Sequence, residues 1–181
     1  MRTAHIPLAL AAALVAAVAL TGCSEEKKAA APQLPERNCF GIFTRDDLEP
    51  LMGKGEEVKE SGPVDVKLTA ERRSATCNVD VDGEGRFLAS ATRQPLDQSF
   101  FWMREMIKPP PDPLDLGDEA IVYDTGARVA FSCKGPKDMF HVELTVSGSI
   151  EQMKKGESRP LFAKLIKKFV DVAKQQTQCD S

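Results

Sequence analysis

The chain has 181 residues and a formal charge of −3; 28% of its residues are charged, 42% are hydrophobic and 6% are aromatic. That length suits one domain of ordinary size or two very small ones. The negative charge argues against a nucleic-acid-binding protein, and the aliphatic content excludes a disordered chain.

Residues 1–22 have the pattern of a secretory signal peptide. Arg2 supplies a positive charge, and the run from Ile6 to Leu20 is apolar and uncharged. The run is shorter than the about 20 residues that a helix needs to cross a bilayer, and it suits the apolar region of an export signal. Removal of this segment takes Arg2 away and leaves a formal charge of −4.

The signal ends in Leu20-Thr21-Gly22-Cys23, which resembles the lipobox of bacterial lipoproteins. In these proteins the cysteine thiol receives a diacylglyceryl group, and the chain is cut just before it. The resemblance implies that Cys23 is lipidated and that the protein is anchored at the extracytoplasmic face of the cell membrane. Two acyl chains hold a protein stably on a bilayer, whereas one chain is marginal. An ordinary signal peptide or an uncleaved anchor is the alternative.

The expected organisation is a lipidated cysteine with a flexible tether over residues 23–38, followed by a folded domain over residues 39–181. The segment 24–38 is polar, contains Ala and Pro, and lacks apolar periodicity. Such a segment behaves as a flexible linker.

Four cysteines remain in the domain, and an even number in an exported chain predicts two disulfides. Of the three connectivities that four cysteines allow, we favour Cys39–Cys77 and Cys133–Cys179, each closing a loop of about 40 residues. No pair has the close spacing typical of zinc ligands, so we predict no metal site there.

The first half of the domain contains one short helix and three strands. Thr44 and Asp47 are spaced as a capping box, which predicts a helix over residues 45–52, although Pro50 is awkward beyond its first turn. Alternating apolar residues predict strands over 64–70, 77–81 and 87–93, with a hairpin turn at residues 82–85.

In the second half, a helix is expected over residues 97–108, ended by the proline-rich loop 109–113. Strands are predicted over 119–123, 127–133 and 140–147. Ser158 can cap a last helix, in which an apolar stripe runs from Leu161 to Ala173.

This order of elements predicts the α+β class. We expect a single two-layer domain with a mainly antiparallel sheet of about six strands. The C-terminal amphipathic helix packs on the sheet, and one or two shorter helices complete the fold.

Three stretches of the domain are similar to small actinobacterial envelope lipoproteins that form a domain family of unknown function: Cys39–Leu48 with Leu51–Gly53, Thr76–Val79, and Leu116–Ala120. The resemblance implies a lipid-anchored extracytoplasmic α+β domain and transfers no catalytic residue. Members often carry an aromatic residue where this chain has Val79. The late cysteines, Cys133 and Cys179, have no place in the family pattern.

The chain offers little for catalysis. His141 is the one histidine outside the signal, and it shares a strand face with Glu143. Such a pair could bind a metal or act as a base, but the pattern favours a solvated face. Residues 80–85 resemble a calcium loop superficially and lack its later ligands, so a hairpin turn is favoured. We predict no catalytic residue, no metal and no cofactor.

Six apolar residues in the expected helix over 97–108 cover nearly all of its sides, whereas a surface helix needs only one apolar stripe. Either this helix lies inside the domain, which we favour, or one side of it is an exposed docking surface. In the second case the candidate partner-binding residues are Phe101, Trp102, Met103 and Pro110.

The leading hypothesis is a lipid-anchored, non-enzymatic binding or interaction module of the cell envelope. Its partners would be the membrane, through the lipid anchor, and an unidentified envelope protein, lipid or glycan, with no role for nucleic acid. The alternatives are a small envelope hydrolase that uses paired carboxylates and a purely structural accessory lipoprotein.

Overall fold

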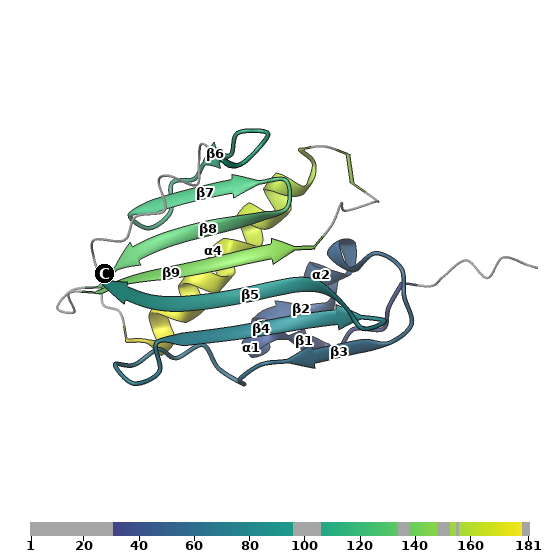
Figure 1. The fold of residues 1–181 in the computed structure, drawn as a ribbon, viewed down its shortest axis with the longest axis horizontal. Helices are drawn as coiled ribbons and strands as arrows, with labels where there is room; N and C mark the ends of the chain where they lie inside the picture. The colour runs from purple at the N-terminus through teal and green to yellow at the C-terminus, as the bar shows by residue number, and fades with distance from the viewer. Residues whose placement is uncertain (1–30, 96–105, 134–137, 148–152, 155, 179–181) are drawn as a thin grey trace, which may run out of the picture.

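A computed structural model describes residues 31–95, 106–133, 138–147, 153–154 and 156–178. Its main sheet is formed by β3 (Val58–Ser61), β4 (Ser74–Val81), β5 (Glu84–Pro95), β6 (Asp112–Pro113), β7 (Glu119–Tyr123), β8 (Gly126–Ser132) and β9 (Asp138–Val146). The order across the sheet is β3-β4-β5-β9-β8-β7-β6, and neighbouring strands are antiparallel (Figure 1). The predicted α+β class with a mainly antiparallel sheet is confirmed, and the sheet has seven strands instead of about six.

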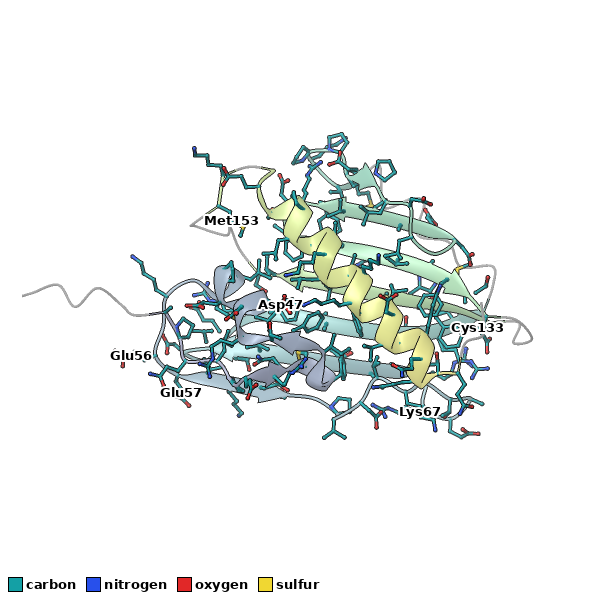
Figure 2. The ribbon with its side chains drawn as sticks, turned by 180° about the vertical axis from the view of Figure 1, so that it is seen from behind. Asp47, Glu56, Glu57, Lys67, Cys133 and Met153 are labelled. Atoms are coloured by element: carbon teal, nitrogen blue, oxygen red, sulfur yellow. A yellow bond between two sulfur atoms is a disulfide. The ribbon has the colours of Figure 1, made fainter. Side chains whose placement is uncertain are left out.

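Helix α4 (Ser158–Gln176) lies obliquely across one face of this sheet (Figures 1 and 2). The predicted apolar stripe faces the sheet, and its buried residues are Phe162, Leu165, Ile166, Phe169, Val170 and Ala173. The predicted cap is wrong, because Ser158 lies inside the first turn and its Oγ donates to the carbonyl oxygen of Asp124 at 2.7 Å. This bond ties the start of α4 to the turn between β7 and β8.

The hairpin of β4 and β5 forms where the sequence predicts it. Asp82 and Gly83 make the turn with φ values of 53° and 79°, and this left-handed conformation suits Asp and Gly in two-residue hairpins. The Asp82 carboxylate accepts hydrogen bonds from the backbone N–H groups of Glu56 and Glu57. The residues that superficially resemble a calcium loop therefore form a turn whose acidic side chain already has protein partners.

The strand predicted over residues 64–70 is wrong, and the edge strand of the sheet is β3 instead. Backbone groups of this segment bind side chains in place of a neighbouring strand: Val66 N–H donates to Gln176 Oε1, and Lys67 N–H donates to Asp65 Oδ1. Alternation survives in the burial of Val66 and Leu68, which are 0% and 5% exposed.

The folded region begins earlier than the expected boundary at residue 38. Leu34 is 1% exposed, and its carbonyl oxygen accepts a hydrogen bond from Arg45 Nε at 2.8 Å. Strand β1 (Arg37–Asn38) pairs with β2 (Phe43–Thr44) in a separate two-stranded sheet. The tether prediction missed this because a single buried leucine among polar residues leaves no periodic pattern.

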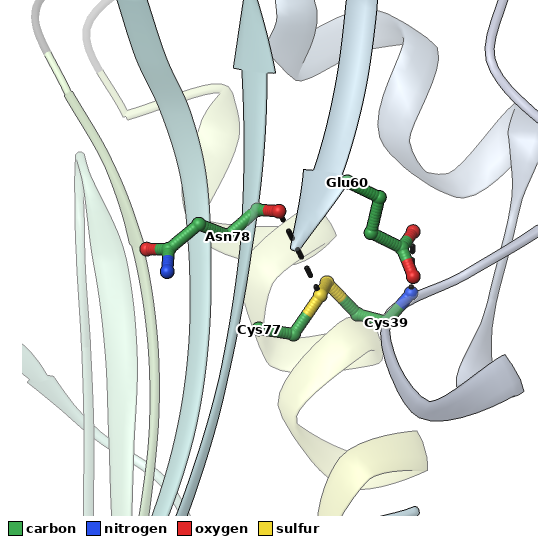
Figure 3. Close-up of a disulfide and its surroundings, with 4 residues drawn as sticks. All are labelled: Cys39, Glu60, Cys77 and Asn78. Carbon is green, nitrogen blue, oxygen red and sulfur yellow. Dashed lines mark hydrogen bonds between the residues drawn. A yellow bond between two sulfur atoms is a disulfide. The ribbon is translucent and has the colours of Figure 1, made fainter. Parts of the chain in front are cut away.

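Cys39 and Cys77 form the expected disulfide, with an S–S distance of 2.00 Å and a Cα–Cα distance of 5.4 Å. It joins β4 to α1 (Cys39–Ile42), a left-handed turn in which Phe40 has φ 60°. That conformation costs a non-glycine residue about 1–2 kcal/mol. The turn is held by the disulfide, by Glu60 accepting the Cys39 N–H (Figure 3), and by the stacking of Phe40 on Phe169.

For the second predicted disulfide, the structure describes Cys133 but not Cys179. Cys133 is 9% exposed and is part of a disulfide. The last turns of α4 lie near β8, since Lys174 Nζ lies 5.2 Å from the centroid of the Phe131 ring. Cys179 lies outside the described residues, so the pairing Cys133–Cys179 stays a prediction.

Helix α2 (Arg45–Met52) begins with the predicted capping box, in which Thr44 and Asp47 exchange side chain to backbone hydrogen bonds. The buried Asp47 carboxylate also binds Lys164 Nζ at 3.1 Å and Lys168 Nζ at 2.6 Å. Burial acts to raise the pKa of Asp47, but the bonds from Lys168, Thr44 and Lys164 hold it well below its usual range. One carboxylate thus caps α2 and joins α2 to α4.

Replacing both cysteines of the first disulfide, in a Cys39→Ala/Cys77→Ala variant, should lower the free energy of unfolding by about 4 kcal/mol. The chain-entropy model gives this value for a loop of this length, since the two residues are 38 apart. Urea denaturation of the wild-type chain and the variant measures the difference. An unchanged unfolding midpoint would contradict the structural role of this bridge.

An Asp47→Asn variant should lose about 2 kcal/mol of stability at pH 7, because the asparagine cannot bind two lysines as an ion. The folded pKa of Asp47 is depressed. Its contribution is therefore fully present above the unfolded pKa, which is about 3.9, and falls as the pH drops toward the folded pKa. Urea denaturation at pH 7 and pH 3 should show a smaller difference between the two proteins at pH 3. A constant difference would contradict the assignment.

Candidate functional site

A pocket of about 550 Å³ lies where β6, β7 and the first turns of α4 meet. Its apolar walls are Pro109, Leu114, Val122, Pro160 and Ala163, and its other lining residues are Asp112, Asp124, Gly156 and Arg159. This volume is typical of ligand sites, which combine apolar walls with few polar groups. The pocket is therefore the strongest candidate for a binding site in the part of the chain that the structure describes.

Arg159 connects the three elements around the pocket. Its Nε donates to Asp124 Oδ1 at 2.7 Å, and its Nη1 lies 2.8 Å from Asp112 Oδ2. The Arg159 side chain is only 15% exposed, while those of Asp124 and Asp112 are 22% and 60% exposed. Hydrogen bonds from Arg159 to Asp112 and Asp124 raise its pKa further above its ordinary value. The guanidinium thus fixes both the strand pair and the helix start.

The position of Arg159 has an electrostatic reason. A cation in the first turn of a helix is disfavoured by the positive end of the helix dipole. Two carboxylates, Asp112 of β6 and Asp124 of the β7–β8 turn, compensate for this, because both contact the same guanidinium. The sequence does show Arg159 as a basic residue in the first turn of the predicted helix, just before the apolar stripe. It does not show its two acidic partners, which are more than 30 positions away.

The proline loop predicted as part of a docking surface lies at this pocket. Pro109 is one of its walls, and Pro110 is exposed. Met106, at the end of the expected docking helix, is 70% exposed, whereas Ile107 packs beside the buried pair Ile121 and Tyr123. Phe101, Trp102 and Met103 lie outside the described residues, so their role stays a prediction.

The sheet face opposite α4 carries a polar network. Glu143 forms an ion pair with Arg128 on the neighbouring strand, and both residues hydrogen-bond to the Tyr123 side chain. Burial and then the Glu143 charge raise the pKa of Tyr123 above its ordinary value. Glu143 therefore has a partner other than His141, and the geometry gives no support to a His–Glu metal pair.

The described ranges offer few side chains that lie close enough together to bind a metal ion. There, one group of three candidate ligands lies within ligand distance of one another, namely Cys39, Glu60 and Cys77. The two sulfur atoms of this group are bonded to each other. A disulfide offers no thiolate to a metal ion, so this group is structural.

A second hollow of about 410 Å³ lies at the start of the folded region. Its lining is polar and charged: Glu36, Arg37, Thr44, Arg45 and Asp46. Arg45 is already engaged with the carbonyl oxygen of Leu34. This hollow lacks the apolar walls that give a ligand site most of its affinity.

The larger pocket, which contains Asp112 and Asp124, does not suit hydrolysis by paired carboxylates. It needs one carboxyl that keeps its proton and acts as the general acid. Asp112 and Asp124 both bind the guanidinium of Arg159, so the two carboxylates of the pocket are paired with one cation and do not face each other across an open cleft as acid and base. The arrangement suits binding better than proton transfer.

An Arg159→Gln variant should lose about 1–2 kcal/mol of stability, because the less exposed Asp124 loses its cation. Hydrogen exchange of backbone amides over residues 109–124 should also become faster, since β6 is then released from α4. The matched control is Arg72→Gln, which breaks the more exposed ion pair with Asp65 and should cost less than about 1 kcal/mol. Equal exchange over 109–124 in the two variants would contradict the connecting role of Arg159.

Within the described ranges, no helix has the length and apolar character needed to cross a membrane. No protein-family model, no curated protein and no solved structure matches the chain. The lipobox and the resemblance to envelope lipoproteins therefore stay predictions from the sequence, and the function is argued below from the geometry of the pocket.

Proposed function

We propose that the protein is a lipid-anchored, extracytoplasmic binding module whose binding site is the pocket between β6, β7 and α4. The observation that carries the site is a pocket of about 550 Å³ with apolar walls, in which Arg159 pairs with Asp112 and Asp124. The lipid anchor is supported by the sequence Leu20-Thr21-Gly22-Cys23.

The shape of the site supports binding of a partner in place of catalysis. Three rigid prolines precede β6, and the exposed Pro110 stands beside the pocket. Proline loses little conformational freedom when a surface is covered, so such a rim favours docking. The purely structural alternative gains no comparable support, because it gives the cavity no role.

The anchor is tested with a Cys23→Ala variant. The wild-type chain should stay in the membrane fraction after a high-salt wash and a carbonate wash, because two acyl chains anchor it. The variant should appear in the soluble fraction. A Cys23→Ala protein that resists both washes would show that something other than the acyl group holds the chain.

The pocket is tested by photo-crosslinking in cells. A benzophenone amino acid at Pro110 should give an adduct that is lost when Ala163→Phe fills the pocket, while the thermal unfolding midpoint stays within a few degrees of wild type. The control position is Lys67, which is exposed and lies beside the other end of α4 (Figure 2). Identical adducts from both positions, or an adduct that survives Ala163→Phe, would exclude this pocket as the site.

A further inference from the structure

The charges that line the pocket do not cancel. The described lining holds two acidic residues, Asp112 and Asp124, and one basic residue, Arg159. Both acids bind this one guanidinium. Asp112 is the more exposed of the two, with 60% of its side chain accessible. The described lining thus keeps one net negative charge after the ion pairs are counted, and Asp112 presents it to solvent.

The walls of the same pocket are mainly apolar. Leu114, Val122 and Ala163 offer only carbon atoms in their side chains, and Pro109 and Pro160 add two rigid rings. A ligand that complements this lining therefore brings an apolar group for the carbon surface and a positive charge for Asp112. This combination is the charge complementarity that orients partners at protein interfaces.

Other ligand chemistries fit less well. An anionic lipid headgroup would meet the exposed carboxylate of Asp112, and the repulsion opposes binding. A sugar needs several hydrogen-bonding groups, and the described lining supplies mainly carbon surface with three charged side chains that already pair with one another. A segment of protein chain can present an apolar side chain beside a lysine or arginine.

We infer that the pocket binds a basic segment of a partner protein, with an apolar side chain on Leu114, Val122 and Ala163 and a neighbouring lysine or arginine at Asp112. This inference rests on the proposed function, since it names the partner of the same site. Asp112 is the natural contact for the cation, because its side chain is 60% exposed and only one of its two oxygens is bound by Arg159.

The experiment is a titration of the full-length chain, kept in a non-ionic detergent, with fluorescent acetylated hexapeptides. One peptide alternates leucine with lysine, a second alternates leucine with glutamate, and a third alternates serine with lysine. The leucine–lysine peptide should bind at least ten-fold more tightly than the other two in 50 mM salt. Its advantage over the glutamate peptide should shrink in 500 mM salt, because exposed charges are then screened.

Variants assign this preference to the pocket. Ala163→Phe should abolish binding of the leucine–lysine peptide, whereas Ala163→Ser, which leaves the cavity open, should not. Asp112→Asn should weaken binding on the order of five-fold, as expected for loss of one exposed ion pair. The matched control is Asp65→Asn, which removes an exposed acid near the other end of α4 and should leave the affinity unchanged. Circular dichroism melts confirm that each variant is folded.

The outcomes separate this inference from the proposed function. Equal binding of lysine and glutamate peptides, lost in Ala163→Phe, overturns the basic partner and leaves the pocket as the site. Binding of the lysine peptide that survives Ala163→Phe overturns both. No binding of any peptide, with cross-linking at Pro110 still dependent on the open pocket, overturns the basic peptide alone.

Discussion

Burial of one face of α4 is the constraint on which the rest of the structure depends. Four of its large apolar side chains are fully buried: Phe162, Leu165, Ile166 and Phe169. Each such side chain contributes roughly 1.5–3 kcal/mol when it is removed from water. With this face fixed on the sheet, the other sides of α4 are presented to specific partners. Its lysines reach the buried Asp47 of α2, and its first turn reaches the strands around the pocket.

The pocket depends on an unfavourable interaction, between the helix dipole and the Arg159 cation, that neighbouring carboxylates offset. Arg159 stands in a turn where the helix dipole disfavours a cation, and carboxylates of β6 and the β7–β8 turn offset that cost. The same ion pairs keep β6, a strand of only two residues, against the rest of the sheet. Because Arg159 is nearly covered while Asp112 is exposed, the internal pairing leaves negative charge at the surface. The geometry of the pocket and the charge on which the inferred basic partner rests thus both depend on Arg159.

Sequence patterns predicted the elements in which burial alternates strictly. The stretch from Phe140 to Val146 is an example, because every second residue in it is buried. Residues 64–70 show the same alternation without a partner strand, since side chains such as Gln176 take their backbone hydrogen bonds. The pocket could not be predicted, because Asp112, Asp124 and Arg159 are distant in sequence and meet only after the sheet and α4 pack. The rigidity of the proline loop could be predicted, because it depends only on the prolines themselves.

Under the proposed anchoring at Cys23, the burial of Leu34 sets how far the domain can stand from the membrane. With the folded region starting near Pro32, about eight residues separate Cys23 from the domain, and they span at most about 28 Å when fully extended. If Cys23 is lipidated as proposed, a domain on so short a connection reaches only a thin layer above the lipid headgroups. Under the proposed anchoring, the partners that it meets are those held in, on or close to the same membrane. Their effective concentration in that layer is high, so even a modest affinity at the pocket would suffice for capture.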